Sequence, residues 1–400
     1  HFGLKKAGME RLEAKLAFFD VEVATPGAGV IARLALPADA SGLEVKERLC
    51  SVVEAPVAEL RLVVGSRPLE GRQRLQDVAE EYTGVGKMPI PVTLLRTRPS
   101  LGFGLSSGRD RALRFWDLDH KGSSCHVASP LAGSEVLCMA VDWSSRQILT
   151  GGKDGVLQLW QLEEGSWDAR PPENLPGAHA DWLRCLAVGW ECRRALSGSY
   201  DGTLRLWDLD AREPLRELRG HDCCVRCVAA HWHAEIAASG GDDFSLRLWD
   251  LTRGVCTRAL AGHSGGLACL ALEWPSRQAL TGASDRSMRL WDLGTGECVR
   301  ELTGHIGGVL CLALDWKAQR ALSGSEDRTL RLWDLAQGDC MHVMRGHRDW
   351  IRCLVVDWPS QRALSGSDDR TLRLWDLDGA ATLRVLKGHS DGVWCVASQW

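Results

Sequence analysis

From residue 100 onward the chain repeats one pattern of apolar and polar positions. In RALSGSDDRTLRLWDL, residues 362–377, an apolar segment is followed by a polar turn and then by a segment in which apolar and polar residues alternate. GHRDWIRCLVVDW before it combines a turn with an apolar segment, and CMHVMRGH links two copies. Short runs of this kind, bounded by turn residues, predict four antiparallel strands in each copy.

A Trp followed by Asp, or in one copy by Gln, marks each repeat. It occurs seven times, at spacings of 44, 47, 42, 42, 42 and 42 residues: Trp116, Trp160, Trp207, Trp249, Trp291, Trp333 and Trp375. Four-stranded units of this length resemble WD repeats, as found in G-protein beta-like proteins. The resemblance covers residues 100–400 and implies a mainly β fold, a seven-bladed β-propeller.

The two ends of the repeat region complete each other. GHSDGVWCVASQW, residues 388–400, contains only the first strand of a copy, whereas the chain after Ser100 begins in register with a second strand. We therefore predict a closing blade shared between residues 100–130 and 388–400. Such sharing closes the ring and leaves no open sheet edge.

A His, a Ser or Thr, and an Asp precede the Trp of most copies by 28, ten and six residues. Nucleophilic catalysis uses these residue types in proximity, but one ring would then hold six equivalent active sites. In the WD-repeat proteins that the chain resembles, the four positions form a buried hydrogen-bonded network. We interpret them as structural tetrads: His179, Ser197, Asp201, Trp207; His221, Ser239, Asp243, Trp249; His263, Thr281, Asp285, Trp291; His305, Ser323, Asp327, Trp333; His347, Ser365, Asp369, Trp375; and His389, Ser106, Asp110, Trp116.

The first full copy departs from this pattern. Ala132 stands at the His position and Gln161 follows the Trp, although Thr150 and Asp154 remain. We expect this blade to be the least tightly held of the seven.

The fifteen cysteines are scattered and odd in number, which favours a reduced intracellular setting, cytoplasmic or nuclear. Seven of them fall on the predicted first strands, one per blade, and are expected to be small buried hydrophobes. Zinc ligands commonly come as CxxC pairs. Cys223, Cys224 and Cys227 beside His221 form the only local cluster, with a single CxxC spacing from Cys224 to Cys227. We expect no metal and no cofactor.

The region before the repeats contains no Trp and no copy of the repeat. FDVEVATP and GVIARLALP alternate as a hairpin does, SGLEVKERLCSVVEAP at residues 41–56 starts with a capping box, and two strand-like segments follow. This β-β-α-β-β order, with the stretch RLVVGSRPLEGRQRLQDV, resembles ubiquitin. It implies an α+β ubiquitin-like (β-grasp) domain over residues 16–98, after a lead-in at residues 1–15.

The resemblance places Val63 at the centre of the apolar recognition patch of ubiquitin. Pro99 and Ser100 stand where ubiquitin carries its diglycine, so the domain is expected to be a fixed module that is not conjugated. Leu62, Val63 and Val64 either form a docking patch or fill the core, because alternation lets only one or two of them face outward.

Partner contacts are expected where the copies differ, since repeat proteins keep a scaffold and vary its loops. In WD-repeat proteins the variable positions of one face lie near the start of the first strand and just before the turn Asp. Trp, Tyr and Arg, the residues that dominate binding hot spots, gather there on an arc. The alternative is that each Trp packs against a neighbouring loop. The candidate partner-binding residues are Trp182, Arg184, Tyr200, Arg226, Trp350, Arg352, Asp368, Trp394 and Arg109.

The composition narrows the function classes. With 45% hydrophobic residues, 25% charged residues and a net charge of −4, the chain resembles an ordinary soluble protein and offers no electrostatic case for nucleic acid or a membrane surface. His347, Arg348 and Asp349 copy the start of a kinase catalytic loop, but no Asn follows Asp349 five residues on and no Asp-Phe-Gly occurs. We therefore expect no enzyme and no small-molecule substrate.

The favoured function is a non-catalytic scaffold or adaptor that acts as a monomer. Its propeller would bind protein or peptide partners, and its ubiquitin-like domain would dock to a receptor. One alternative is an adaptor in the ubiquitin–proteasome system. Another is a non-catalytic fragment of a larger signalling enzyme.

Overall fold

The computed structural model describes nine stretches of the chain, namely residues 18–25, 29–37, 60–64, 67–69, 90–96, 102–118, 125–129, 134–163 and 169–400. The chain divides into two compact units, His1–Leu101 and Gly102–Trp400. In the first unit and at residues 125–129, the description is limited to the backbone.

The first unit contains a five-stranded mixed sheet with the strand order β2-β1-β5-β3-β4. β1 and β2 form the antiparallel pair that their alternating pattern predicts, and β5 joins β1 in parallel. The strands are β1 (Phe18–Thr25), β2 (Gly29–Pro37), β3 (Leu60–Val64), β4 (Arg67–Leu69) and β5 (Ile90–Arg96). The lead-in at residues 1–15 and the helix expected over residues 41–56 lie outside the described residues.

Val63 lies in the middle strand of the β5-β3-β4 part of this sheet. Its backbone pairs with Pro68 of β4 and with Thr93 of β5. The side chains of β3 lie outside the description, so the choice between a docking patch and a core position stays a prediction.

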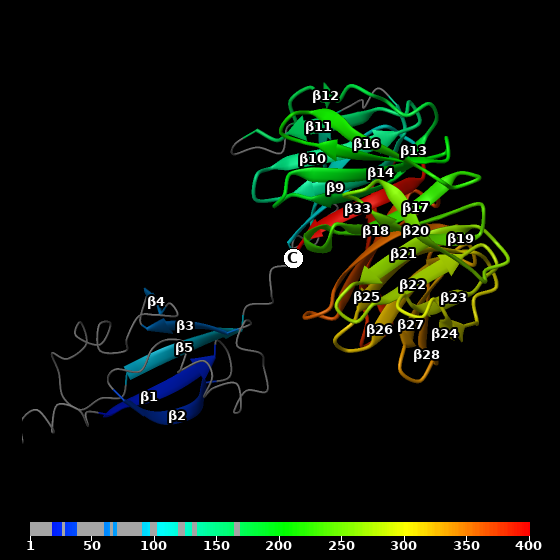
Figure 1. The fold of residues 1–400 in the computed structure, drawn as a ribbon. Helices are drawn as coiled ribbons and strands as arrows, with labels where there is room; N and C mark the ends of the chain where they lie inside the picture. The colour runs from blue at the N-terminus through cyan, green and yellow to red at the C-terminus, as the bar shows by residue number, and fades with distance from the viewer. Residues whose placement is uncertain are drawn as a thin grey trace, which may run out of the picture. The chain divides into compact units, whose positions relative to one another are not determined.

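The second unit is a closed ring of seven four-stranded sheets, which confirms the predicted seven-bladed propeller (Figure 1). The first strand of each blade contacts the first strands of both neighbouring blades, so these strands surround the central axis. We number the blades in chain order and call the shared one blade 7.

The strands of the blades follow in order from the axis outward. Blade 1 has β9 (Val136–Asp142), β10 (Gln147–Gly152), β11 (Leu157–Gln161), β12 (Glu173–Asn174); blade 2 has β13 (Leu183–Gly189), β14 (Arg194–Ser199), β15 (Thr203–Asp208), β16 (Glu213–Arg219); blade 3 has β17 (Val225–His231), β18 (Ile236–Gly241), β19 (Ser245–Asp250), β20 (Val255–Ala261). Blade 4 has β21 (Leu267–Glu273), β22 (Gln278–Ala283), β23 (Met288–Asp292), β24 (Cys298–Leu302); blade 5 has β25 (Val309–Asp315), β26 (Arg320–Ser325), β27 (Thr329–Asp334), β28 (Cys340–Arg345); blade 6 has β29 (Ile351–Asp357), β30 (Arg362–Ser367), β31 (Thr371–Asp376), β32 (Ala381–Lys387). Blade 7 has β33 (Val393–Gln399), β6 (Phe103–Gly108), β7 (Leu113–Asp117), β8 (Cys125–Ser129), and a short 3-10 helix η2 (Trp232–Ala234) joins β17 to β18.

Blade 7 joins the two ends of the propeller unit. β33 pairs antiparallel with β6, so that Val396 faces Ser106 across the sheet. β33 also contacts the first strands of blades 1 and 6. The C-terminal strand therefore supplies the innermost position of a sheet whose other strands come from residues 103–129.

The tight turn between the second and third strands follows from its sequence. In blade 6 the carboxylate of Asp369 accepts the backbone N–H of Thr371 at 3.0 Å. Arg370 between them adopts a positive φ of 67°. An Asp side chain that bonds the backbone two residues later stabilises such a turn, which explains the recurrence of Asp at this position.

The core is built between blades as well as within them. The repeat Trp residues are all buried, with at most 2% of their surface exposed. Trp375 of blade 6, for example, packs in one cluster with Leu322, Leu330 and Leu332 of blade 5. Because an indole of this kind buries about 150–250 Å² of surface, each blade depends on its neighbour for a large part of its core.

A glycine in the second strand lets neighbouring blades approach. A Cβ on Gly366 of blade 6 would lie 2.7 Å from Cys353 Sγ and 2.7 Å from the Val393 side chain of blade 7. We expect Gly366→Ala to lower the free energy of unfolding by about 1–3 kcal/mol, because overpacking shifts the two blades apart. Urea unfolding checks this against Gly294→Ala, an exposed position whose nearest neighbour would lie at 3.1 Å; equal midpoints for the two variants would contradict the packing argument.

Candidate binding face

The four members of each tetrad are joined in one chain of hydrogen bonds. The Trp indole N–H donates to the Ser or Thr hydroxyl at 2.7–2.8 Å. That hydroxyl lies 2.6–2.8 Å from His Nε2. His Nδ1 lies 2.7–3.0 Å from the Asp carboxylate. The structure therefore brings all the predicted tetrad residues together in blades 2 to 7.

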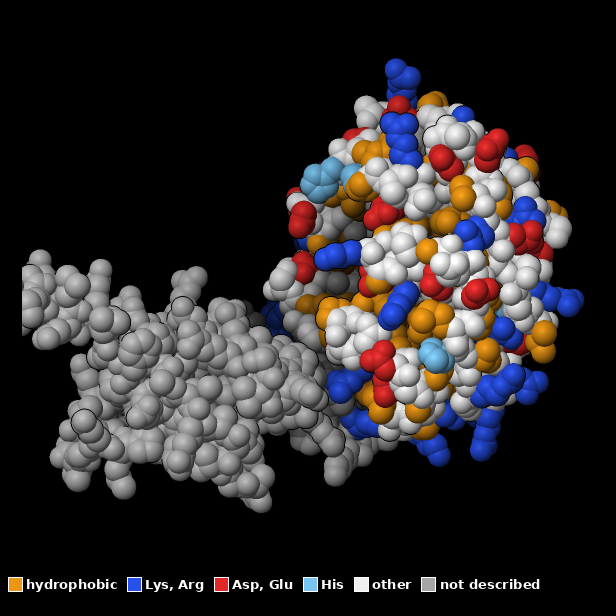
Figure 2. All heavy atoms as spheres, turned by 90° about the horizontal axis from the view of Figure 1, so that it is seen from below, with side chains coloured by type: hydrophobic (Ala, Val, Ile, Leu, Met, Phe, Trp, Pro, Cys, Tyr) orange, Lys and Arg blue, Asp and Glu red, His pale blue; other side chains and the backbone are white. Residues whose placement is uncertain are grey.

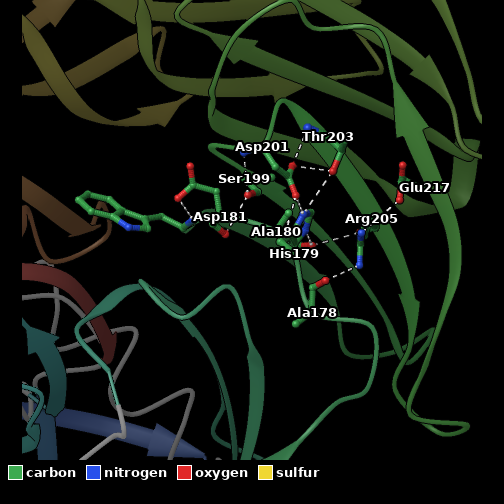
Figure 3. A network of polar contacts seen from close by, with 12 residues as sticks. Ala178, His179, Ala180, Asp181, Ser199, Asp201, Thr203, Arg205 and Glu217 are labelled. Atoms are coloured by element: carbon green, nitrogen blue, oxygen red, sulfur yellow. Dashed lines mark hydrogen bonds and ion pairs between the residues drawn. The ribbon is translucent and has the colours of Figure 1, made fainter.

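Blade 2 shows how the network fixes its loops (Figure 3). The carboxylate of Asp201 faces His179 and also accepts the hydroxyl of Thr203 at 2.7 Å. Arg205 lies two residues after Thr203 in β15 and donates to the carbonyl of Ala178 at 2.7 Å. The loop that enters the blade is thus tied to the turn after its second strand.

The protons of the network can be assigned from these contacts. An ionised Asp only accepts, so His Nδ1 carries the proton, Nε2 accepts from the Ser hydroxyl, and the Ser oxygen accepts from the indole. Burial lowers the pKa of His221, His263 and His347, which keeps these imidazoles neutral. Burial raises the pKa of Asp201 and Asp369, but the hydrogen bonds from His, from Thr and from the backbone, together with the charge interaction with His, outweigh burial and lower the pKa overall.

The tetrads are sealed from solvent. Ser197, Ser239, Ser323 and Ser365 are fully buried, and their hydroxyls are bound on both sides. A substrate could reach such a hydroxyl only if the blade opened. The arrangement therefore serves the fold, as the six-fold repetition suggests.

Acid should destabilise the propeller in two steps. His221, His263 and His347 have lowered pKa values in the fold, so below about pH 6.5 the unfolded chain binds protons that the folded chain does not. The contribution of these histidines to the free energy of unfolding is therefore complete above this pH and falls as the pH drops. The tetrad Asp residues have a lowered pKa in the fold, so their contribution to the free energy of unfolding is lost below about pH 4. Urea midpoints measured from pH 8 to pH 5 at constant ionic strength check this, and a midpoint that rises toward pH 5 would refute it.

Blade 1 lacks the complete network. Trp160 still donates to Thr150 at 2.8 Å. The backbone N–H of Asp154 is bound by the hydroxyl of Ser134 at 3.1 Å. Ala132 lies outside the described residues. The reduced network supports the expectation that this blade is held less tightly than the others.

The candidate partner-binding residues lie at the same end of the blades as the tetrad histidines, which we call the top face. It comprises the loops that enter the first strands and the turns between the second and third strands. Trp182, for instance, directly precedes β13, and its carbonyl accepts the backbone N–H of Tyr200 at 2.9 Å. The two variable positions of a blade are therefore neighbours in space.

Three arginines surround the indole of Trp394. The guanidinium carbons of Arg109, Arg184 and Arg352 lie 5.3, 5.7 and 5.0 Å from its ring centre. Asp368 holds this group in place, since it accepts the indole N–H at 2.9 Å and an N–H of Arg352 at 2.8 Å. We call these five residues the Trp394 cluster.

A second aromatic group lies on blades 1 and 2. Trp182 stacks on Tyr200 with ring centres 5.3 Å apart and an angle of 19° between the planes. The ammonium of Lys153 lies 4.5 Å from the Trp182 ring centre. We call these three residues the Trp182 cluster.

Glu135 connects the two clusters. Its carboxylate lies 2.8 Å from Lys153 Nζ and 3.7 Å from Arg109 Nε. At the other end of the arc, Trp350 lies under the Arg352 guanidinium at 4.7 Å. Eight of the nine candidate residues, all but Arg226, thus form one continuous series of contacts from Trp350 to Tyr200.

Arg226 lies farther along the ring and is bound separately. Burial lowers its pKa, but the carboxylate of Asp242 at 3.1 Å and the nearby Tyr200 hold the pKa above its usual range. Arg226 makes no ring contact with Trp394 among the described interactions, and its ion pair with Asp242 stands apart from the two clusters.

Arg184 of blade 2 reaches the backbone of blade 1 at Leu137 and the indole of Trp394 on blade 7. Burial raises the pKa of the first-strand thiols, to about 12 for Cys138 and Cys227, while Arg184 opposes the rise at six of them, which belong to six different blades. Arg184 donates to the carbonyl of Leu137 at 3.3 Å and has no carboxylate partner within the described part of the chain.

Glu135 and Lys153 are the functional-face residues that sequence reasoning did not select. Both stand at variable positions of blade 1, so the alignment of the copies brings them into view. The hot-spot argument favours Trp, Tyr and Arg and therefore does not select a Lys or a Glu, although here Lys153 and Glu135 join two aromatic groups.

Neither a metal-binding group nor a membrane-spanning helix is present among the described residues. In the described ranges no group of three or more His, Cys, Asp or Glu side chains could hold a metal ion. Both ring nitrogens of His221, beside the Cys223 cluster, are taken up by Asp243 and Ser239. No helix of the described chain has the length and apolarity to cross a bilayer.

Charge is mixed on the surface of the propeller. Figure 2 shows acidic and basic side chains next to one another across one face, with hydrophobic side chains between them. That face therefore lacks the extended single-sign field that steers nucleic acid onto a protein.

Comparison with known proteins identifies the repeats. The family model described as WD domain, G-beta repeat matches the chain six times, over residues 124–161, 172–208, 212–250, 254–292, 296–334 and 338–376. These matches cover more than half of the chain. The comparison with curated proteins gives no match.

Proposed function

Because the chain belongs to the WD40 repeat family, whose propellers are generally non-catalytic and typically serve protein–protein interaction, we propose that it is an interaction scaffold. Its top face binds a peptide or protein partner through the Trp394 and Trp182 clusters. The scaffold acts as a monomer and needs no cofactor.

The observation that carries this proposal is the continuous arc of aromatic and charged side chains. Trp350 is 39% exposed, and the Arg109 side chain above Trp394 is 45% exposed. Each indole is at the same time fixed by a stack, a cation or a carboxylate. Exposed aromatic groups that are already held in place lose little freedom on binding, which favours affinity.

Charge favours an acidic partner. The two clusters with Glu135 contain four cations, Arg109, Lys153, Arg184 and Arg352, but two carboxylates, Glu135 and Asp368. A partner that carries a carboxylate near the axis would complete the pairing of Arg184. Binding should therefore weaken as salt is raised.

Replacing Trp182, Trp350 and Trp394 together with Ala should abolish affinity capture of top-face partners. These side chains contribute little to the propeller core, so the melting temperature should stay within a few degrees of the parent. A matched control replaces Leu215, Val299 and Leu383 with Ala, which are 47%, 57% and 46% exposed on outer strands. Retained capture by the Trp variant, or equal loss in the control, would count against the proposal.

We propose in addition that the first unit is a ubiquitin-like module, over residues 16–98, that docks to a receptor. The strand order β2-β1-β5-β3-β4, with β1 and β5 parallel, supports this proposal. It also favours the second candidate function, an adaptor in the ubiquitin–proteasome system. Affinity capture with the intact chain and with a chain lacking residues 1–99 would assign each partner to a unit.

An intracellular setting, cytoplasmic or nuclear, completes the proposal. All thirteen cysteines in the described side-chain ranges are free thiols, and seven of them are exposed or partly exposed. Unpaired cysteines in this number are typical of reducing compartments.

A further inference from the structure

A cavity of about 820 Å³ opens on the end of the propeller opposite to the top face. It lies between the turns that join the first and second strands of blades 1, 2 and 3. β13 runs from Leu183, beside the top-face residue Trp182, to Gly189, which lines this cavity. A strand of that length spans about 20 Å, so the cavity is separate from the two clusters above.

Trp190 and Trp232 stand at a position that is Trp in the other blades as well, whereas Gly189 is particular to blade 2. Gly189 ends its first strand where the other six blades carry Asp142, His231, Glu273, Asp315, Asp357 and Gln399. A Cβ on Gly189 would lie 2.6 Å from Cys192 Sγ and 2.7 Å from the Trp232 ring. The missing side chain thus leaves the Trp232 ring close against the backbone of blade 2.

The neighbouring turn of blade 3 is also distinct. It forms the 3-10 helix η2, which begins with Trp232 and is capped by His231, whose Nδ1 accepts the backbone N–H of Ala234 at 3.2 Å. Among the described turns between first and second strands, a 3-10 helix occurs here alone. Trp232 and His233 are therefore presented to the cavity by backbone geometry particular to this blade.

The walls combine indoles with carboxylates. Trp190 and Trp232 are half-buried, and each lines the cavity. Its acidic residues are Asp142 and Glu191. The Asp142 carboxylate accepts the hydroxyls of Ser144 and Ser145 at 2.6 and 2.5 Å, bonds that keep it ionised and fixed.

Basic side chains near the cavity are already bound. Arg193 donates to Asp210 at 2.9 Å and to Gln147 at 2.8 Å. Arg194 forms an ion pair with Glu235 at 2.6 Å. No Lys or Arg is among the residues that line the cavity, so its fixed charge is negative.

We propose that this cavity binds a lysine or arginine side chain of a protein partner. A cation is attracted both to the faces of indole rings and to carboxylates, and the attraction grows where water is partly excluded. The volume is that of an ordinary ligand pocket and accommodates one long side chain with its flanking backbone. Because the cavity lies away from the top face, the scaffold can hold a second partner at the same time.

The test uses the full chain with tryptophan indoles labelled with ¹⁵N. The probes are short alanine peptides that carry one central lysine, arginine or norleucine, and Trp190→Phe and Trp232→Phe assign the two indole signals. The lysine or the arginine peptide should shift the Trp190 and Trp232 signals in a saturable way and leave the Trp394 signal unchanged. Norleucine, which keeps the four-carbon chain of lysine without the ammonium group, should have no effect.

Removing the charge should weaken this binding. The double variant Asp142→Asn, Glu191→Gln keeps the shape and should lower the affinity for the cationic peptide by about tenfold. Asp357→Asn removes a carboxylate from the equivalent turn of blade 6 and should leave the affinity unchanged. The proposal is overturned if neither cationic peptide shifts these signals, if norleucine binds equally well, or if the double variant binds like the parent.

Discussion

Deleting residues 389–400 is expected to open the propeller and to lower its melting temperature by about 10 °C or more. The deletion removes β33, the innermost strand of blade 7, and leaves one edge of β6 without its partner. It also removes His389, so the buried Ser106 and Asp110 lose a hydrogen-bond partner. The first strands of blades 1 and 6 lose their common neighbour.

Differential scanning calorimetry of the parent and the truncated chain measures this effect. A synthetic peptide of residues 388–400 added in excess should restore much of the lost stability, because it supplies the same strand in trans. A melting temperature that does not change on truncation would show that the ring does not depend on its closing strand.

Replacing the tetrad Asp of a complete blade should be far more damaging than replacing the corresponding Asp of blade 1. The Asp369 carboxylate accepts from His347, from the backbone of Arg348 and Thr371, and from the Thr371 hydroxyl. Asp369→Ala leaves the buried His347 Nδ1 without its partner and removes three further hydrogen bonds, and it should lower the free energy of unfolding by about 3 kcal/mol.

The matched control is Asp154→Ala in blade 1. The Asp154 carboxylate is exposed and accepts the backbone N–H of Val156 at 3.2 Å, with no His partner in the described part of that blade. We expect this change to lower the free energy of unfolding by less than about 1 kcal/mol. Urea unfolding of both variants makes the comparison, and equal shifts of the midpoint would mean that the His–Asp bond adds nothing to the fold.

The propeller could be predicted because the residues that define each blade lie close together in the sequence and recur in every copy. The turn Asp, the alternating third strand and the Trp recur at a fixed spacing, and each has the same physical reason in every blade. The register of the closing blade followed from the same spacing, since GHSDGVWCVASQW ends where the chain after Ser100 continues the unit.

The sequence predicts which loop positions form the top face, but not which side chains contact one another there. Loop positions that vary between copies could be named from the alignment, whereas the ring around Trp394 depends on side chains from three blades that approach only in the closed ring. The role of Glu135 between Lys153 and Arg109 is of this kind.

The cavity beside Gly189 was not predicted at all. Large aromatic or charged side chains mark a binding site in a sequence, whereas this site depends on Gly189, which has no side chain. A signal was present, since the end of the first strand carries Asp, Glu or His in the other full copies. Gly189 contributes to a cavity because the next blade forms the 3-10 helix η2, and the repeat pattern does not predict that helix.

The most direct test of the scaffold proposal is amide hydrogen exchange on the propeller with and without a captured partner. Binding at the top face predicts added protection in the loops that enter blades 2, 6 and 7, around Trp182, Trp350 and Trp394. The outer strands should exchange as in the free chain. Protection confined to the outer strands or to residues 1–101, with the three loops unchanged, would contradict the account.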